Sequence, residues 1–381
     1  MRFPEFEGEW KKEQLGDTAD FSKGAGISKE QLSEKGEPCI LYGELYTKYK
    51  SEVIYDIISK TDIDSTKLVR SQANDVIIPS SGETAEDIAT ARCVLKNNIL
   101  LGGDLNIIRL HNHSGSFMSY QLNGKRKYDI AKVAQGVSVV HLYAEHLKGV
   151  NTYNPCMEEQ EKIARLLSLL DERIATQNKI IEDLKKLKSA IIEKLYSKIQ
   201  GKEYSYGQLF EVINERNKQM EYSNILAASQ EKGMVNRDDL NLDIQFERSN
   251  IDIYKIVRKG DYVIHLRSFQ GGFAFSNMTG VCSPAYTILR PSTLLEYGYL
   301  SYYFKSYRFI KSLIIVTYGI RDGRSISVEE WLNLKISIPS KEHQLHILKV
   351  LRSFDLKIEN EETYASCLSN QKQYLLRQMF I

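Results

Sequence analysis

The sequence predicts an α+β protein: two similar mixed α/β domains separated by two long antiparallel coiled-coil helices, with pseudo-twofold symmetry. Three observations lead to this prediction. The chain has 381 residues, which is more than one hydrophobic core usually holds. A stretch near its middle lacks proline and glycine and is rich in helix-forming residues, and the second half repeats the first in the same order. We expect domains at 1–155 and 201–339 and helices at 156–200 and 340–381.

The repeat is clearest in the two helices. When Pro155 is aligned with Pro339, both copies can be read onward without a gap. The identical pairs that follow are Glu158/Glu342, Gln160/Gln344, Ile163/Ile347, Leu167/Leu351, Asp171/Asp355, Ile174/Ile358, Leu184/Leu368 and Lys188/Lys372. Because the apolar pairs recur at helical spacing, the match follows structure and not composition alone.

Shorter matches link the two domains. The Asp-Val-Ile-Ile run at 75–78 resembles Asp-Tyr-Val-Ile at 261–264, and Ile-Ile-Arg at 107–109 resembles Ile-Leu-Arg at 288–290. Any one of these strand-like matches can arise by chance. Their common order predicts one plan used twice, with loops that have diverged.

The apolar seam of each helix alternates steps of three and four residues, which is the heptad of a coiled coil. Gln177 and Lys188 interrupt the first seam, and Glu361 and Lys372 interrupt the second. If the helices pair within one chain, the second must run back along the first. The register that brings the polar breaks together places Lys188 opposite Glu361 and Gln177 opposite Lys372. A coiled coil between two chains is the open alternative.

Composition limits the possible classes of protein. Net charge is only +2, and the longest basic run is Lys125-Arg126-Lys127, so any surface that binds nucleic acid must come from local clustering. Every apolar run is too short for a membrane span, and the first residues lack the apolar core of a signal peptide. The five cysteines are scattered, which predicts free thiols in a reducing cytoplasm and no thiolate metal site.

We find no set of residues that predicts catalysis. The chain contains no phosphate-binding loop of the Gly-x-x-x-x-Gly-Lys-Ser/Thr type. His343 and His346 are one helical turn apart but have no evident third ligand, so solvated side chains remain the expectation and no metal is predicted.

These patterns resemble the specificity subunit of Type I restriction–modification systems. The opening Arg2-Phe3-Pro4-Glu5-Phe6-Glu7-Gly8-Glu9-Trp10 is similar to a common start of that family. The segment from Pro155 to Ile174 is similar to its first conserved helical region, and the segment from Pro339 to Ile358 is a weaker copy. The resemblance covers essentially the whole chain.

The resemblance implies that the two domains are target recognition domains, each reading one half of a split sequence in double-stranded DNA. It also implies that the helices act as a spacer and bind two modification (methyltransferase) subunits, which restriction subunits can join. S-adenosylmethionine, ATP and Mg would then belong to partner subunits, and this chain would be a non-catalytic subunit without a cofactor. The alternatives are a coiled-coil scaffold that binds proteins without DNA, or a fragment of a larger methylase.

Arg, Lys and Gln suit contacts with phosphates and base edges. The candidate DNA-binding residues are Lys67, Arg70, Gln72, Lys125, Arg126 and Lys127 in the first domain and Arg267, Ser268, Gln270, Arg321 and Arg324 in the second. Residues that recur outside the seam are candidates for the subunit interface or for helix–domain contacts: Gln160, Asp171, Gln344 and Asp355. For each single residue, an ordinary solvated side chain is the competing interpretation.

Overall fold

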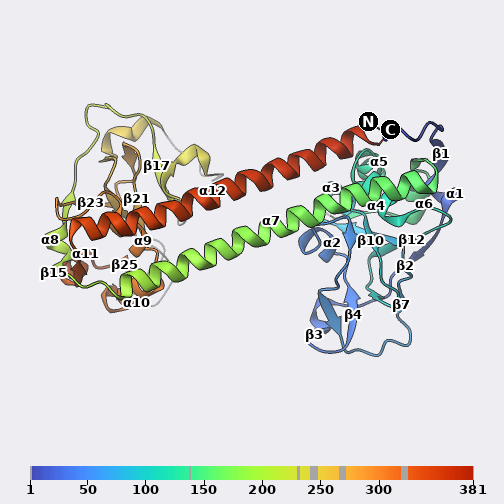
Figure 1. Cartoon of the computed structure of the whole chain (residues 1–381), viewed down its shortest axis with the longest axis horizontal. Helices are drawn as coiled ribbons and strands as arrows, with labels where there is room; N and C mark the ends of the chain where they lie inside the picture. The colour runs from blue at the N-terminus through green and yellow to red at the C-terminus, as the bar shows by residue number, and fades with distance from the viewer. Residues whose placement is uncertain are drawn as a thin grey trace. The chain divides into compact units, whose positions relative to one another are not determined.

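The computed structural model describes residues 2–136, 139–229, 232–240, 248–265, 272–318 and 325–380. The chain forms two compact units: unit 1 contains Met1–Lys179 and Glu362–Ile381, and unit 2 contains Ile180–Glu361. The long helices are α7 (Met157–Ser197) and α12 (Lys341–Gln378), and each contributes one part to each unit (Figure 1). None of the described helices is long and apolar enough to cross a membrane.

Unit 1 is built on two five-stranded sheets. The first has the order β2-β12-β8-β10-β5 and the second the order β3-β6-β4-β11-β7, while β1 pairs with β14 and β9 with β13. The strands are β1 Lys11–Gln14, β2 Ala19–Lys23, β3 Leu32–Ser33, β4 Glu37–Ile40, β5 Val53–Ile54, β6 Ser59–Thr61, β7 Val69–Arg70, β8 Asp75–Pro79, β9 Ser81–Gly82, β10 Arg92–Val94, β11 Leu100–Leu101, β12 Leu105–Leu110, β13 Val140–His141 and β14 Asn151–Asn154. The helices are α1 Leu15–Thr18, η1 Lys29–Gln31, α2 Glu44–Thr47, α3 Ala85–Ile88, α4 Gly115–Asn123, α5 Lys127–Val133 and α6 Ala144–Lys148.

Unit 2 contains a four-stranded sheet of order β16-β23-β20-β21 and four strand pairs, β15-β26, β17-β18, β19-β22 and β24-β25. The strands are β15 Lys202–Ser205, β16 Phe210–Ile213, β17 Leu226–Ser229, β18 Gly233–Asn236, β19 Lys255–Val257, β20 Tyr262–Ile264, β21 Phe273–Phe275, β22 Gly280–Cys282, β23 Thr287–Pro291, β24 Thr317–Tyr318, β25 Ser325–Ile326 and β26 Lys335–Ile338. The helices are α8 Tyr206–Leu209, η2 Arg237–Asp239, η3 Arg248–Ile253, α9 Tyr299–Tyr303, α10 Tyr307–Ser312, η4 Leu313–Val316 and α11 Val328–Asn333.

The two units share one plan, as the repeat predicted. Each domain begins with a strand that pairs antiparallel with the strand just before the long helix, β1 with β14 and β15 with β26. In each, the strand that begins at or directly after the repeated aspartate pairs with the strand that carries the repeated arginine, β8 with β12 and β20 with β23. The predicted fold class, two similar mixed α/β domains with two long helices, is therefore confirmed.

The long helices are antiparallel within each unit. In unit 1, Asp171 contacts Lys372, and Arg173 lies 5.5 Å from the ring centre of Tyr364, so residue numbers rise along α7 as they fall along α12. In unit 2 the ion pair between Lys188 and Asp355 joins the same two helices.

The end of α12 completes the core of unit 1. Leu376, Met379 and Phe380 are buried in one apolar cluster with the sheet and with α4. The ring of Phe380 lies 5.3 Å from that of Phe117 and 6.4 Å from that of Trp10. The last residues of the chain are thus part of its first domain.

Candidate nucleic-acid interface and the helix seam

A buried glutamine fastens each long helix to its own domain. In unit 1, Gln160 Oε1 accepts a hydrogen bond from the Ser114 backbone N–H at 3.0 Å, and its Nε2 donates to the Pro155 carbonyl at 2.9 Å. In unit 2, Gln344 Oε1 accepts from the Glu296 N–H at 2.8 Å, and its Nε2 donates to the Pro339 carbonyl at 3.1 Å. Both residues are 1% exposed. They make helix–domain contacts, which is one of the two roles predicted for them.

The repeated aspartates also bind within their own unit. Asp171 Oδ2 accepts from the Tyr120 hydroxyl at 2.7 Å, and Asp355 Oδ2 accepts from the Tyr302 hydroxyl. A lysine of the opposite helix completes each set: Lys372 Nζ lies 2.5 Å from Asp171 Oδ1, and Lys188 pairs with Asp355 Oδ1. Asp171 and Asp355 therefore hold the helix pair and the domain together, which is the helix–domain role that the sequence left open beside a subunit interface.

These ion pairs also correct the predicted polar layers. Lys188 was expected opposite Glu361, but it pairs with Asp355, while Glu361 pairs with Lys357 one turn away on the same helix. Lys372 was expected opposite Gln177, but it pairs with Asp171. For Lys372 the physical reason is that a charged lysine in a largely buried position gains more from a carboxylate than from a neutral amide.

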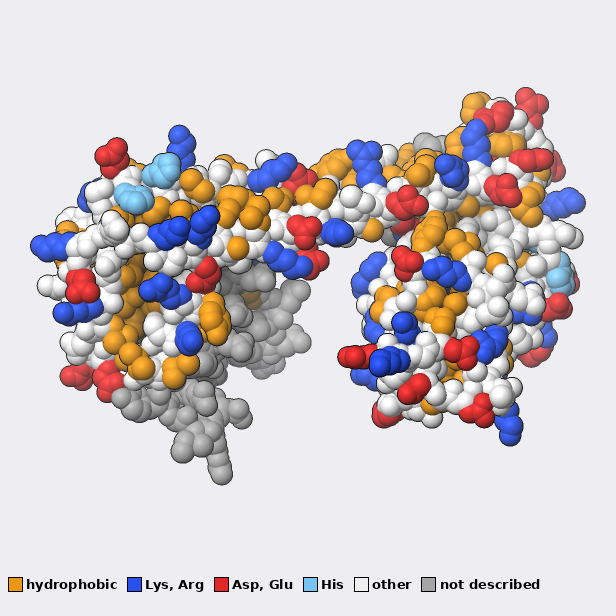
Figure 2. Space-filling model, turned by 60° about the horizontal axis from the view of Figure 1, so that its bottom comes forward, with side chains coloured by type: hydrophobic (Ala, Val, Ile, Leu, Met, Phe, Trp, Pro, Cys, Tyr) orange, Lys and Arg blue, Asp and Glu red, His pale blue; other side chains and the backbone are white. Residues whose placement is uncertain are grey.

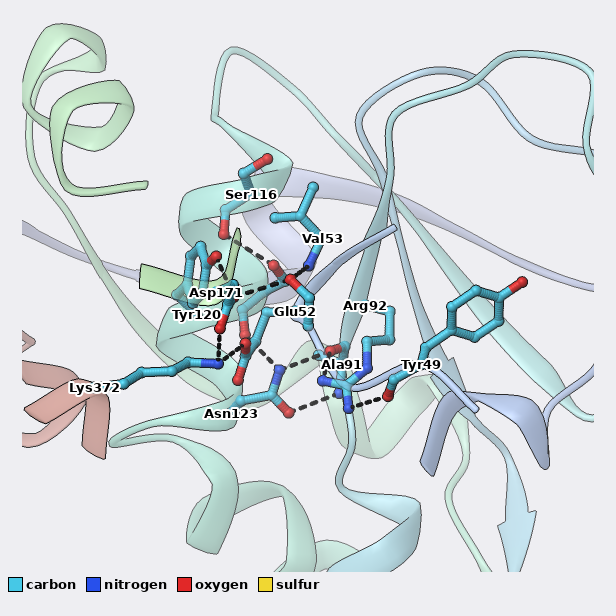
Figure 3. Close-up of polar contacts among 12 residues, drawn as sticks. Tyr49, Glu52, Val53, Ala91, Arg92, Ser116, Tyr120, Asn123, Asp171 and Lys372 are labelled. Atoms are coloured by element: carbon cyan, nitrogen blue, oxygen red, sulfur yellow. Dashed lines mark hydrogen bonds and ion pairs between the residues drawn. The ribbon is translucent and has the colours of Figure 1, made fainter. Parts of the chain in front are cut away.

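In unit 1, the helix lysine, Lys372, has a second carboxylate as a partner (Figure 3). Lys372 also pairs with Glu52, and the side chains of Lys372, Glu52 and Asp171 are 9%, 9% and 7% exposed. Burial raises the pKa of Glu52 and of the Tyr120 hydroxyl, and burial lowers the pKa of nearby Arg92. Every polar group of this cluster has partners inside unit 1, which indicates a structural role rather than a binding role.

Arg70 is already engaged within unit 1, whereas its predicted neighbours are exposed. Its guanidinium holds Glu37 at 2.6 Å, and these hydrogen bonds lower the pKa of Glu37 from 4.5 to about 2. Lys67 and Gln72 are exposed on the segments that flank β7, so they present free side chains beside a fixed arginine.

The predicted basic run lies at the turn between α4 and α5. Lys125 is exposed, and Lys127 is half-buried at the first position of α5. Arg126 pairs with Asp129 at 3.2 Å and lies 5.3 Å from the ring centre of Tyr153. Lys125 therefore remains the most accessible candidate of the three.

The candidates of the second domain lie outside the described residues: Arg267, Ser268, Gln270, Arg321 and Arg324.

Surface charges of both signs are interspersed. Figure 2 shows Lys and Arg side chains among Asp and Glu on the faces of both units that it displays. The described residues contain no group of three or more His, Cys, Asp or Glu side chains that could hold a metal ion.

Sequence reasoning missed a pair of basic residues in unit 2. Arg216 and Lys255 face each other in an antiparallel β-bridge. A signal was present, because Lys255 precedes Asp261 by the same number of residues as Val69 precedes Asp75. When the repeat is extended upstream of Asp75 and Asp261, residues 255–258 align with residues 69–72.

Comparisons with known proteins agree with this architecture. Residues 7–186 match the family model of the Type I restriction modification DNA specificity domain. The Type I restriction enzyme MjaVIII specificity subunit of Methanocaldococcus jannaschii is 26% identical over 202 residues, which cover 52% of this chain and 44% of that protein. The putative type I restriction enzyme MjaX specificity subunit of the same organism is 24% identical over 252 residues, covering 61% and 58%. The matches thus span about half the length of these curated relatives.

Solved structures share the fold of the whole chain. The S subunit of the Type-I restriction-modification system from M. genitalium matches 100% of this chain and 97% of its own, with a TM-score of 0.57 and 16% identity. A chain from a structural study of complex assembly and conformational transition of the type I R-M system matches 98% and 97%, with a TM-score of 0.61 and 14% identity. At these identities the likeness concerns the fold, but it agrees with the family match. The comparisons therefore show that residues 7–186 match the Type I restriction modification DNA specificity domain and that the chain shares the fold of solved S subunits.

Proposed function

We propose that this chain is a non-catalytic subunit that reads a split sequence in double-stranded DNA and directs adenine methyltransferase subunits to it. The observation that carries this proposal is the duplication of the recognition fold, with a buried glutamine joining each domain to its helix. Such anchoring favours two rigid readers, because a buried amide that bonds to two segments fixes one against the other.

Each domain would read one half-site through base edges and phosphates, and the base pairs between the half-sites would be unread or sensed only through their shape. Lys67, Gln72 and Lys125 are the exposed candidates in unit 1. We further propose that S-adenosylmethionine, ATP and Mg are bound by partner subunits, with two modification subunits per chain and restriction subunits as optional partners.

Methylome sequencing tests this function directly. Cells that express the chain with its cognate modification subunits should carry a methylated motif in two parts, and the motif should disappear when the chain is omitted. A complex that binds other proteins but methylates no motif would favour the scaffold alternative.

The spacer role is tested by inserting one heptad into both α7 and α12. A heptad preserves the seam and adds roughly 10 Å of helix, the length of about three base pairs. The unread gap should lengthen, or specific methylation should be lost. An unchanged motif with an unchanged gap would contradict the spacer role. In the matched control, seven residues on the exposed helix faces are replaced by alanine and glutamate, so the length of the helices stays unchanged.

A further inference from the structure

The second recognition domain carries two basic residues directly opposite each other, Lys255 on β19 and Arg216 on the segment that follows β16. Arg216 and Lys255 form an antiparallel β-bridge. The backbone hydrogen bonds on either side of them run at 2.9 Å from Asn217 to the Tyr254 carbonyl and from Ile256 to the Glu215 carbonyl. This pattern makes Arg216 and Lys255 a non-hydrogen-bonded pair, in which opposite Cα atoms are about 4.5 Å apart and side chains are closest.

Two like charges in this position destabilise a sheet, so we expect a negatively charged group that offsets their repulsion. The acid of the same segment, Glu215, does not supply it, because its Oε1 accepts from Arg258 at 2.9 Å. Lys255 Nζ donates one hydrogen bond, at 2.8 Å, to the neutral carbonyl of Tyr286. Burial lowers the pKa of Lys255, and the charge of Arg216 lowers it further.

The backbone around the pair is held firmly. Asn217 is 1% exposed, and its side chain donates to the Tyr222 carbonyl at 2.8 Å and accepts from the Tyr222 N–H at 3.2 Å. This fixes the turn that follows Arg216. A ligand would therefore meet two cations carried on a fixed backbone, which reduces the entropy lost on binding.

In the internal repeat, the strand that carries Lys255 aligns with the segment of unit 1 that carries the candidate DNA-binding residues. The Gln72 N–H donates to Asp75 Oδ2 at 2.7 Å, and the Arg258 N–H donates to Asp261 Oδ2 at 2.9 Å, so the two turns are structural equivalents. Strand β19, which begins with Lys255, thus corresponds to β7.

The pair is also linked through Tyr286 to His265, which precedes the predicted reading segment of unit 2 in the sequence. Lys255 binds the carbonyl of Tyr286, and the ring centre of Tyr286 lies 6.2 Å from that of His265. Arg267 follows two residues later in the sequence.

We propose that Arg216 and Lys255 together hold one phosphate of the DNA backbone and so anchor the second recognition domain without reading sequence. The inference rests on the proposed function and adds a site to it. The ammonium of Lys255 has two donors left beyond its bond to Tyr286, and the guanidinium of Arg216 supplies further donors. A phosphate oxygen accepts from both and neutralises their repulsion.

The test is the salt dependence of DNA binding by the full chain assembled with its modification subunits. Arg216→Gln and Lys255→Gln are compared with wild type on a duplex that contains the methylated motif and on a duplex that lacks it. Each variant should bind both duplexes roughly tenfold more weakly, and the slope of log affinity against log salt should fall by about 1. The double variant should lose little more slope than either single variant, because one phosphate is shared.

The matched control is Lys202→Gln, an exposed lysine on β15, which should leave affinity and slope unchanged. Thermal unfolding gives an independent readout: Arg216→Gln should raise the melting temperature of the free chain, because it removes a like-charge contact, whereas loss of a structural residue would lower it. The methylated motif should stay the same.

The outcomes separate this inference from the proposed function. A wild-type complex without any sequence-specific binding or methylation would overturn the function itself. A specific wild-type complex whose Arg216 and Lys255 variants behave like Lys202→Gln would overturn only the anchor. Fully additive losses of slope would show two separate phosphates and contradict the shared one, and a changed motif would show base reading instead.

Discussion

At the residue scale, each domain repeats two aspartates that accept charged hydrogen bonds, one at its sheet and one on its long helix. Asp75 and Asp261 are 1% and 2% exposed, and each accepts two hydrogen bonds, at 2.9 and 3.0 Å respectively, from an arginine on the neighbouring strand. The helix aspartates, Asp171 and Asp355, accept instead from a tyrosine and a lysine. The positions of these paired charges are therefore repeated in both domains, although their burial differs.

The two helix lysines differ in burial, and this difference predicts unequal effects on stability. The side chain of Lys372 is 9% exposed and serves two carboxylates, whereas Lys188 and Asp355 are 22% and 45% exposed. Lys372→Met should cost about 3–5 kcal/mol in the free energy of unfolding, because it leaves Glu52 and Asp171 buried without their ion-pair partner. Lys188→Met should cost about 1 kcal/mol or less.

Urea denaturation of the two lysine variants measures this difference. The control is Lys186→Met, whose side chain is 67% exposed and pairs along the same helix with Glu182. Adding Glu52→Gln to Lys372→Met should restore part of the lost stability, because one of the two uncompensated charges disappears. Equal losses for Lys372→Met and Lys188→Met would contradict this account.

At the element scale, the sequence predicted which segments correspond but not which atoms meet. The helices and the matched strand blocks followed from spacing and order, and the structure contains them in the expected order. The polar layers were wrong because a heptad seam permits several registers that differ by whole turns, and Glu52, which lies far away in the sequence, supplies one of the charges that Lys372 needs. The Arg216–Lys255 pair was missed because the matched blocks begin at the aspartates, downstream of Lys255, and because Arg216 lies outside the named strands.

The joint between helix and domain gives an element-scale prediction. Gln160→Ala should leave the Ser114 N–H and the Pro155 carbonyl without their side-chain partner, at a cost of about 1–3 kcal/mol for each buried group. Amide hydrogen exchange at Ser114 should accelerate, and the β8–β12 ladder should be much less affected. Glu161→Ala, at an exposed position on the same turn, is the control. Unchanged protection at Ser114 would show that the amide does not hold this joint.

At the scale of the whole molecule, the two units differ in how the chain builds them. Unit 2 is one continuous segment, whereas unit 1 needs two segments from opposite ends of the sequence. Figure 1 shows the N- and C-termini close to each other, and the rings of Trp10 and Phe380 pack edge to face. The stability of unit 1 therefore depends on residues that sequence order assigns to the end of the second helix.

This dependence predicts a localised effect of one C-terminal substitution. Phe380 is 3% exposed in the core of unit 1, and Phe380→Ala should cost about 3–5 kcal/mol there. Hydrogen exchange should accelerate throughout β8, β10 and β12 and stay unchanged in β20 and β23. Tyr374→Ala, at a side chain that is 54% exposed on the same helix, should have little effect. Equal acceleration in both units would show that they unfold as one body.

The place of Phe380 also has a consequence for synthesis on the ribosome. Although most of unit 1 is translated first, its interior cannot close until the codons for Leu376, Met379 and Phe380 have been read. A chain that stalls before those codons would therefore carry an open apolar surface on unit 1, which chaperones and proteases recognise. Quality control can thus recognise such a stalled copy by the part that was made earliest.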